Sequence, residues 1–217
     1  MKNDEVIIHI KEDHTVRLGI CEHGKSRTKF ITPDRLFECI KGSIKTESTS
    51  TGLLPSNIIC VKSDNKGKRY AVVEYQYDRA DVTYMNTVYN DFPLPRILFG
   101  FIIESSGRIS SVNLGVPNLG NLKENTQMFC YPLSNVSRFQ MCTGANALPH
   151  IKSLQSLKNL PDFILSLPDN DDHYQDRNNR LNLGHRDLME HLKDKDRQYY
   201  YDHILVPMPN TTLKDFL

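Results

Sequence analysis

The sequence predicts an α+β fold in which an antiparallel β-meander is packed against C-terminal helices, with a small ββα-like extension at the N-terminus. Hairpin patterns fill the middle of the chain, and apolar residues with nearly helical spacing follow after position 150. A stretch rich in Ser and Thr at residues 43–52 has no apolar period and is typical of a linker. We therefore expect two domains, residues 1–46 and residues 53–217.

The extension is expected to contain two strands and a helix, and residues 29–31 are a candidate for extending the strand pairing. Residues 6–10 and 15–20 alternate apolar and polar side chains around a polar turn, which predicts a hairpin. Thr32 and Pro33 then predict a helix start, because threonine can cap free backbone amides and proline fits the first helical position. We expect this helix to end near Gly42.

The second domain begins with a run of hairpins. Apolar, β-branched and aromatic stretches predict four strands, at residues 57–61, 70–75, 96–103 and 109–115. Residues typical of turns separate the two members of each pair, and residues 126–131 supply a last strand. Consecutive antiparallel strands form a meander, one face of which must be covered.

Helices that can cover this face follow the strands. Apolar residues recur every three positions over residues 151–160 and predict a helical run that Pro161 interrupts. Residues 163–167 continue it as a second short piece, and a last helix is expected over residues 185–195. Between them, residues 169–179 contain eight Asp, Asn or Gln residues and no aliphatic side chain, which predicts a solvated loop. The prolines at residues 207–210 predict an irregular tail.

Composition weakens several classes of function. The 27 basic and 26 acidic residues balance, whereas phosphate binding usually needs a basic excess, so only the basic turn at residues 62–69 favours nucleic acid. Apolar runs are far shorter than the roughly 20 residues of a membrane span, and no export signal opens the chain. We therefore expect a cytoplasmic protein with no membrane partner. Five cysteines without CxxC spacing indicate reduced thiols rather than disulfides or a zinc ribbon.

Metal-binding interpretations are weak. Cys21 and His23 could supply two ligands, but no second pair with zinc spacing follows. The acidic residues at 169–176 lack the glycine and the terminal glutamate of a calcium loop. There is no Walker loop and no GxSxG elbow, so we expect neither a metal nor another cofactor.

The segment at residues 129–144 carries the most informative pattern. Tyr131 and the following proline, then Asn135, precede Cys142, which follows the asparagine by seven positions. This segment resembles the active-site segment of ubiquitin-conjugating enzymes, where a His-Pro-Asn triplet precedes the catalytic cysteine by about eight residues. Here Tyr131 stands in place of the usual histidine.

The chain more closely resembles the prokaryotic ubiquitin-conjugating-like family D, which includes protein B of the PRTRC plasmid system. Residues 53–55 followed by a hairpin ending at residues 72–75 are similar to the first half of that family, and residues 93–100 are similar to its central hairpin. Together with the spacing from Asn135 to Cys142, the similarity covers most of the chain.

The resemblance implies a ubiquitin-conjugating-like fold and a thiol-dependent acyltransferase. Cys142 would carry a modifier as a thioester, and Asn135 would either stabilise the oxyanion or brace the loop that holds the cysteine. Thr143 and Gly144 suit a tight turn whose amides approach the thioester. Tyr131 and His173 are candidates for supporting roles.

The resemblance also implies partners. They are a ubiquitin-like modifier protein and an ATP-dependent activating enzyme. A deconjugating metalloprotease is a further candidate partner in such a pathway. An alternative from another class is an inactive conjugating-like scaffold in a plasmid-maintenance or phage-defence complex, which Tyr131 in place of histidine favours. A nucleic-acid-binding accessory protein is the third hypothesis, carried only by the basic turn at residues 62–69.

Overall fold

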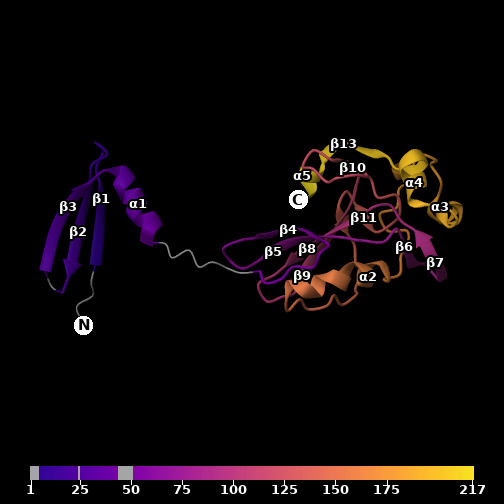
Figure 1. Ribbon diagram of the computed structural model, residues 1–217, viewed down its shortest axis with the longest axis horizontal. Coiled ribbons are helices and arrows are strands. Elements are labelled where there is room, and N and C mark those ends of the chain that lie inside the picture. Colours follow the sequence, from indigo (N-terminus) through magenta and orange to yellow (C-terminus); the bar gives the residue numbers. More distant parts are fainter. Residues whose placement is uncertain (1–4, 24, 44–50) are drawn as a thin grey trace. The chain divides into compact units, whose positions relative to one another are not determined.

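The computed structural model describes residues 5–23, 25–43 and 51–217, and the chain divides into two compact units, residues 1–50 and 51–217 (Figure 1). The division falls inside the stretch rich in Ser and Thr. In the first unit, three antiparallel strands in the order β1-β2-β3 precede one helix, so the ββα-like expectation lacked one strand, β3, which extends the pairing at residues 25–31. Their bounds are β1 Glu5–Ile10, β2 Val16–Glu22, β3 Lys25–Ile31 and α1 Pro33–Ser43.

The predicted helix start in this first unit is confirmed. The Thr32 hydroxyl oxygen accepts a hydrogen bond from the Arg35 backbone N–H at 3.2 Å, and Pro33 opens the helix. In the described part of this unit, Val16 is the single hydrophobic residue that is buried. Phe30 and Phe37 are each about 60% exposed. The unit thus leaves much of its apolar surface in contact with solvent.

The second unit is built on antiparallel strands, so the α+β class is confirmed (Figure 1). Its main sheet runs in the order β11-β12-β9-β8-β5-β4, with β10 pairing to both β9 and β13, while β6 and β7 form a separate hairpin. The strands are β4 Ile58–Ser63, β5 Arg69–Glu74, β6 Arg79–Tyr84, β7 Thr87–Pro93, β8 Leu98–Ile103, β9 Ile109–Pro117, β10 Gln127–Phe129, β11 Val136–Ser137, β12 Gln140–Met141 and β13 Pro207–Thr212.

The helices of the second unit are short. They are η1 Leu154–Asn159, α2 Leu160–Leu165, η2 Asp176–Asn178, α3 His185–Leu192, α4 Arg197–Tyr199, the π-turn η3 Tyr200–Ile204 and α5 Leu213–Phe216. The run is divided at Pro161 as expected, because η1 ends at Asn159 and a separate short helix, α2, begins at Leu160. Pro161 lies in the first turn of α2, where the missing N–H costs nothing. Before it, η1 is a 3₁₀ helix, which explains the three-residue apolar spacing.

Both faces of the main sheet are covered. Val73, Phe99 and Phe101 belong to one buried cluster with Leu154 and Leu157 of η1. On the other side, the smaller cluster consists of Val72, Leu98, Met128, Met208, Leu213 and Phe216. Alternate residues of β5 therefore enter different cores, and the sheet is held between the segment after residue 150 and the C-terminal segment.

One sequence expectation for this unit is wrong, and another is confirmed only in part. The tail at residues 207–210 is not irregular, because β13 pairs with β10 only, and a strand with a free edge tolerates prolines. The loop at residues 169–179 is mostly exposed, as expected, but Asp169 forms a bridge with Tyr84 of β6 and Asn179 is buried. Both segments are fixed by contacts with distant parts of the chain.

Candidate functional site

Cys142 lies in a small cavity of about 100 Å³. Residues from two segments, 141–146 and 167–172, line this cavity together with Asn135. The cysteine directly follows β12, which pairs with both β9 and β11, and its side chain is exposed. The Cys142 backbone N–H donates to the Asn135 carbonyl oxygen at 2.7 Å, so the two residues singled out from the sequence lie next to each other.

The residues after Cys142 form a turn at the rim of this cavity. Gly144 has a φ of +56°, and both the backbone N–H and the side-chain amide of Asn146 donate to the Thr143 carbonyl oxygen, at 3.3 and 2.8 Å. Thr143 and Gly144 both line the cavity. The turn thus keeps these residues beside the cysteine.

The Asn135 side chain is buried and bound to a carboxylate. Its Nδ2 donates to Asp169 Oδ1 at 2.7 Å, and its backbone N–H donates to the Asp172 carbonyl oxygen at 2.7 Å. Asn135 has a φ of +61°, a conformation that asparagine tolerates better than most residues. This geometry corresponds to the bracing role, because the amide joins the Cys142 segment to the opposite wall of the cavity.

Asp169 is the functional candidate that sequence reasoning missed. Its backbone N–H donates to the Thr83 carbonyl oxygen at 2.7 Å, and its own carbonyl oxygen accepts from the Met85 N–H at 2.8 Å. Burial raises the pKa of its carboxyl group from 3.8 to about 7, although the hydrogen bond from Asn135 lowers it. A carboxyl group that gains and loses a proton near neutral pH therefore lines the same cavity as the Cys142 thiol.

A second polar cluster supports this wall of the cavity. Asp171 Oδ1 accepts a hydrogen bond from the Tyr84 hydroxyl at 2.7 Å and lies 3.1 Å from His185 Nδ1. The His185 ring is buried and stacked on Tyr174, with ring centroids 4.5 Å apart. Burial lowers the pKa of His185, which favours the neutral imidazole. The cluster ties the segment around Asp169 to β6 and α3.

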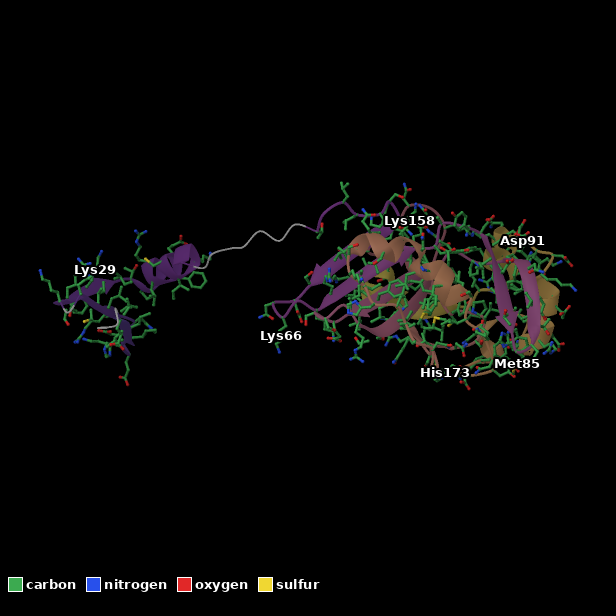
Figure 2. All side chains as sticks on the ribbon, turned by 90° about the horizontal axis from the view of Figure 1, so that it is seen from below. Lys29, Lys66, Met85, Asp91, Lys158 and His173 are labelled. Carbon is green, nitrogen blue, oxygen red and sulfur yellow. The ribbon has the colours of Figure 1, made fainter. Side chains whose placement is uncertain are left out.

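Neither of the two residues proposed for supporting roles, Tyr131 and His173, lines the cavity. Tyr131 is buried, lines a neighbouring pocket instead, and has its pKa raised well above the usual value by burial, so its phenol stays protonated. His173 is exposed on the outer surface of the second unit (Figure 2) and does not line the cavity.

All five cysteines are free thiols. Cys142 and Cys39 are exposed, whereas Cys21, Cys60 and Cys130 are half-buried. Burial raises the pKa of the Cys130 thiol, which disfavours its thiolate form. Exposure alone thus does not distinguish Cys142, because Cys39 in α1 shares it. The two exposed cysteines differ in that Cys142 lines the cavity and Cys39 does not.

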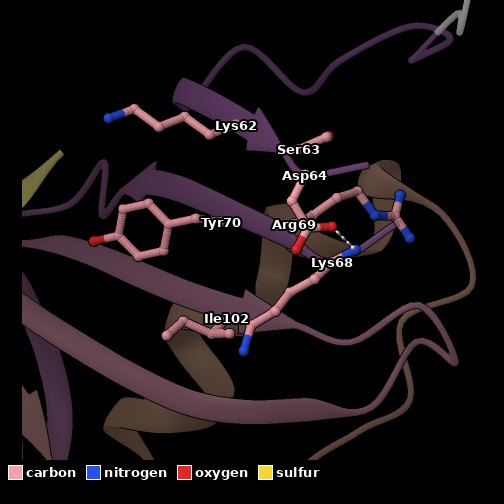
Figure 3. A pocket seen from close by; sticks show the side chains of 7 residues that line it. All are labelled: Lys62, Ser63, Asp64, Lys68, Arg69, Tyr70 and Ile102. Atoms are coloured by element: carbon pink, nitrogen blue, oxygen red, sulfur yellow. Dashed lines mark hydrogen bonds between the residues drawn. The ribbon is translucent and has the colours of Figure 1, made fainter. Parts of the chain in front are cut away.

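A larger groove of about 300 Å³ lies at the β4–β5 hairpin (Figure 3). Lys62, Lys68 and Arg69 line it, but so does Asp64, whose carboxylate accepts from the Lys68 backbone N–H at 2.9 Å. The Lys68 ammonium group also pairs with Glu104 at 3.3 Å. Carboxylates therefore offset part of the positive charge that a nucleic-acid interpretation of this turn requires.

Comparisons with protein-family models, with curated proteins and with solved structures found no match for this chain. The family resemblance of the segment around Cys142 therefore stays a prediction. Within the described residues, no group of three or more His, Cys, Asp or Glu side chains is arranged to hold a metal ion. Helices there are also too short or too polar to cross a lipid bilayer.

Proposed function

We propose that this protein is a thiol-dependent conjugating enzyme of a bacterial ubiquitin-like pathway, with a ubiquitin-conjugating-like fold in its second unit. It accepts the C-terminal acyl group of a modifier on Cys142 and passes it to an amine. One observation supports this best: the exposed Cys142 thiol shares a cavity with Asn135 and with an aspartate whose pKa is about 7. The order of the antiparallel meander and the later helices is compatible with it.

The first step is a transfer between two sulfur atoms. The Cys142 thiolate attacks the thioester carbonyl carbon on the activating enzyme, a new C–S bond forms, and the activating enzyme's sulfur leaves as a thiolate. The donor already carries an activated acyl group, so no base beside the sulfur is required. Because Asp169 engages the Asn135 amide, the backbone amides of Thr143 and Gly144 are the better-placed candidates for oxyanion donors.

The second step transfers the acyl group from Cys142 to an amine. A C–N bond forms, the C–S bond to Cys142 breaks, and the sulfur leaves as a thiolate. The attacking amine must lose a proton, and Asp169 is the group that accepts it in this scheme. A proton acceptor works best when its pKa lies near the working pH, which a value of about 7 satisfies.

The inactive scaffold is the second candidate. Tyr131 favours it, because a buried phenol occupies the position where conjugating enzymes usually carry histidine. Such a protein would bind the modifier and the activating enzyme without carrying an acyl group.

Non-reducing electrophoresis tests the first candidate. Incubation with the activating enzyme, the modifier and ATP should give a heavier band that a thiol reductant removes. Cys142→Ala should abolish this band, whereas Cys39→Ala, which removes the other exposed thiol, should leave it unchanged. A reductant-resistant adduct of wild-type intensity in Cys142→Ala would exclude Cys142 as the carrier. Binding of the modifier with no adduct in the wild type would favour the scaffold.

A further inference from the structure

A second polar pocket, of about 210 Å³, adjoins the Cys142 cavity. On one wall, Asn135 lines the Cys142 cavity and the next residue, Val136, lines the second pocket. On the opposite wall, Asp172 lines the cavity and Gln175 lines the second pocket. The two hollows therefore follow one another along the same two chain segments. We call the second one the arginine pocket, because Arg138 and Arg177 both line it.

No acidic residue of the described chain lines the arginine pocket beside these two arginines. In the part of the chain that the structure describes, neither Arg138 nor Arg177 belongs to an ion pair. Arg177 Nε donates to the uncharged side-chain oxygen of Gln175 at 2.9 Å. The pKa of Asp215 is lowered mainly by a hydrogen bond from the Thr212 backbone N–H at 2.7 Å, and the charge of Arg138 contributes less. The arginine pocket is consequently electropositive.

The other lining groups suit a carboxylate as well. Ser137, Gln175 and Asn178 bring a hydroxyl group and two side-chain amides that can donate hydrogen bonds. A guanidinium group offers parallel N–H donors that match the two oxygens of a carboxylate. The buried Tyr131 forms part of the wall, which gives this residue a place in the pocket rather than at the cysteine.

We propose that the arginine pocket binds an acidic side chain near the C-terminus of the modifier while the terminal carbonyl carbon of the same tail reaches Cys142. This inference rests on the proposed function and deepens it, because it names the substrate class: a modifier whose tail carries Asp or Glu a few residues before its end. An extended chain advances about 3.3 Å per residue, so a few residues link neighbouring hollows.

Nuclear magnetic resonance titration of the full, ¹⁵N-labelled chain tests this binding. The probes are the peptide acetyl-Glu-Gly-Gly-amide, its glutamine analogue and inorganic phosphate. The glutamate peptide should shift the backbone N–H signals of Ser137, Gln175 and Asn178 in a saturable way, and the glutamine peptide should bind at least tenfold more weakly. The double variant Arg138→Ala/Arg177→Ala should weaken glutamate-peptide binding at least tenfold. Arg108→Ala, in the β8–β9 turn and outside both hollows, should not change it.

Three results would overturn the inference: equal binding of the two peptides, unchanged binding in the double variant, or binding of phosphate without binding of the glutamate peptide. The thioester assay separates this inference from the proposed function. A thioester on Cys142 without peptide binding refutes the acidic-tail inference alone. Peptide binding without a thioester refutes the acyl-carrier function and leaves the carboxylate preference of the pocket standing.

Discussion

Asp169→Asn is expected to stabilise the folded protein at pH 8 but not at pH 4. The change in the free energy of unfolding should be more favourable at pH 8 than at pH 4 by up to about 4 kcal/mol. The carboxyl group has a pKa of about 7 in the folded protein and an ordinary value of 3.8. Its contribution to stability is fully present below about pH 4 and is lost as the pH rises through 7, because the unfolded chain releases the proton first. Asparagine does not titrate and keeps an oxygen that can accept from Asn135.

Urea denaturation of the wild type and Asp169→Asn at pH 4 and pH 8 measures this difference. Asp172→Asn is the matched control, because it removes one negative charge from an exposed residue of the same wall. An identical pH dependence of stability in the wild type and Asp169→Asn would show that Asp169 does not titrate abnormally.

The same substitution should impair acyl transfer. Asparagine cannot accept the amine proton, so transfer from Cys142 to an amine is expected to slow by about a hundredfold, whereas the thioester still forms. A single-turnover chase of the preformed thioester with lysine separates the two steps. An enzyme that becomes more stable and less active would show that the buried carboxyl group is retained for its chemistry.

Leu157→Ala is expected to lower the free energy of unfolding of the second unit by about 3 kcal/mol. Leu157 is fully buried in η1, where it packs in the cluster that covers one face of the main sheet, and its truncation leaves a cavity there. Phe163→Ala, in the adjacent α2 at 37% exposure, should cost less than about 1 kcal/mol.

Tyrosine fluorescence during urea denaturation reports on this unit, because all ten tyrosines of the chain lie after residue 50. Equal destabilisation by Leu157→Ala and Phe163→Ala would contradict the buried position of Leu157. It would also contradict the role of η1 in covering the sheet.

Local patterns predict the parts of the fold that short-range interactions determine. The cap at Thr32, the β4–β5 and β8–β9 hairpins and the inward side of α3, with Leu188 and Leu192 buried, all follow from such patterns. The seven-residue spacing from Asn135 to Cys142 likewise corresponds to a real proximity, because the tight β11–β12 hairpin lies between the two residues.

Long-range contacts decide what the sequence alone does not reveal. The composition around Asp169 is that of a solvated loop, and only pairing with the backbone of β6, more than eighty residues earlier, buries its carboxyl group. The alternation of Val82 and Tyr84 could have indicated β6 itself, but not its neighbour in space. In the same way, Tyr131 lies in the arginine pocket because of tertiary packing around it, which no local motif encodes.

Acylation by a small thioester tests the role of Cys142 most directly, because it requires no partner protein. The full chain is incubated with the 2-mercaptoethanesulfonate thioester of acetyl-Gly-Gly, and mass spectrometry of peptides prepared at acidic pH locates the acyl group. We expect Cys142 to be acylated at least tenfold faster than Cys39, the other exposed thiol. Acylation of Cys39 at an equal or higher rate would contradict Cys142 as the acyl carrier.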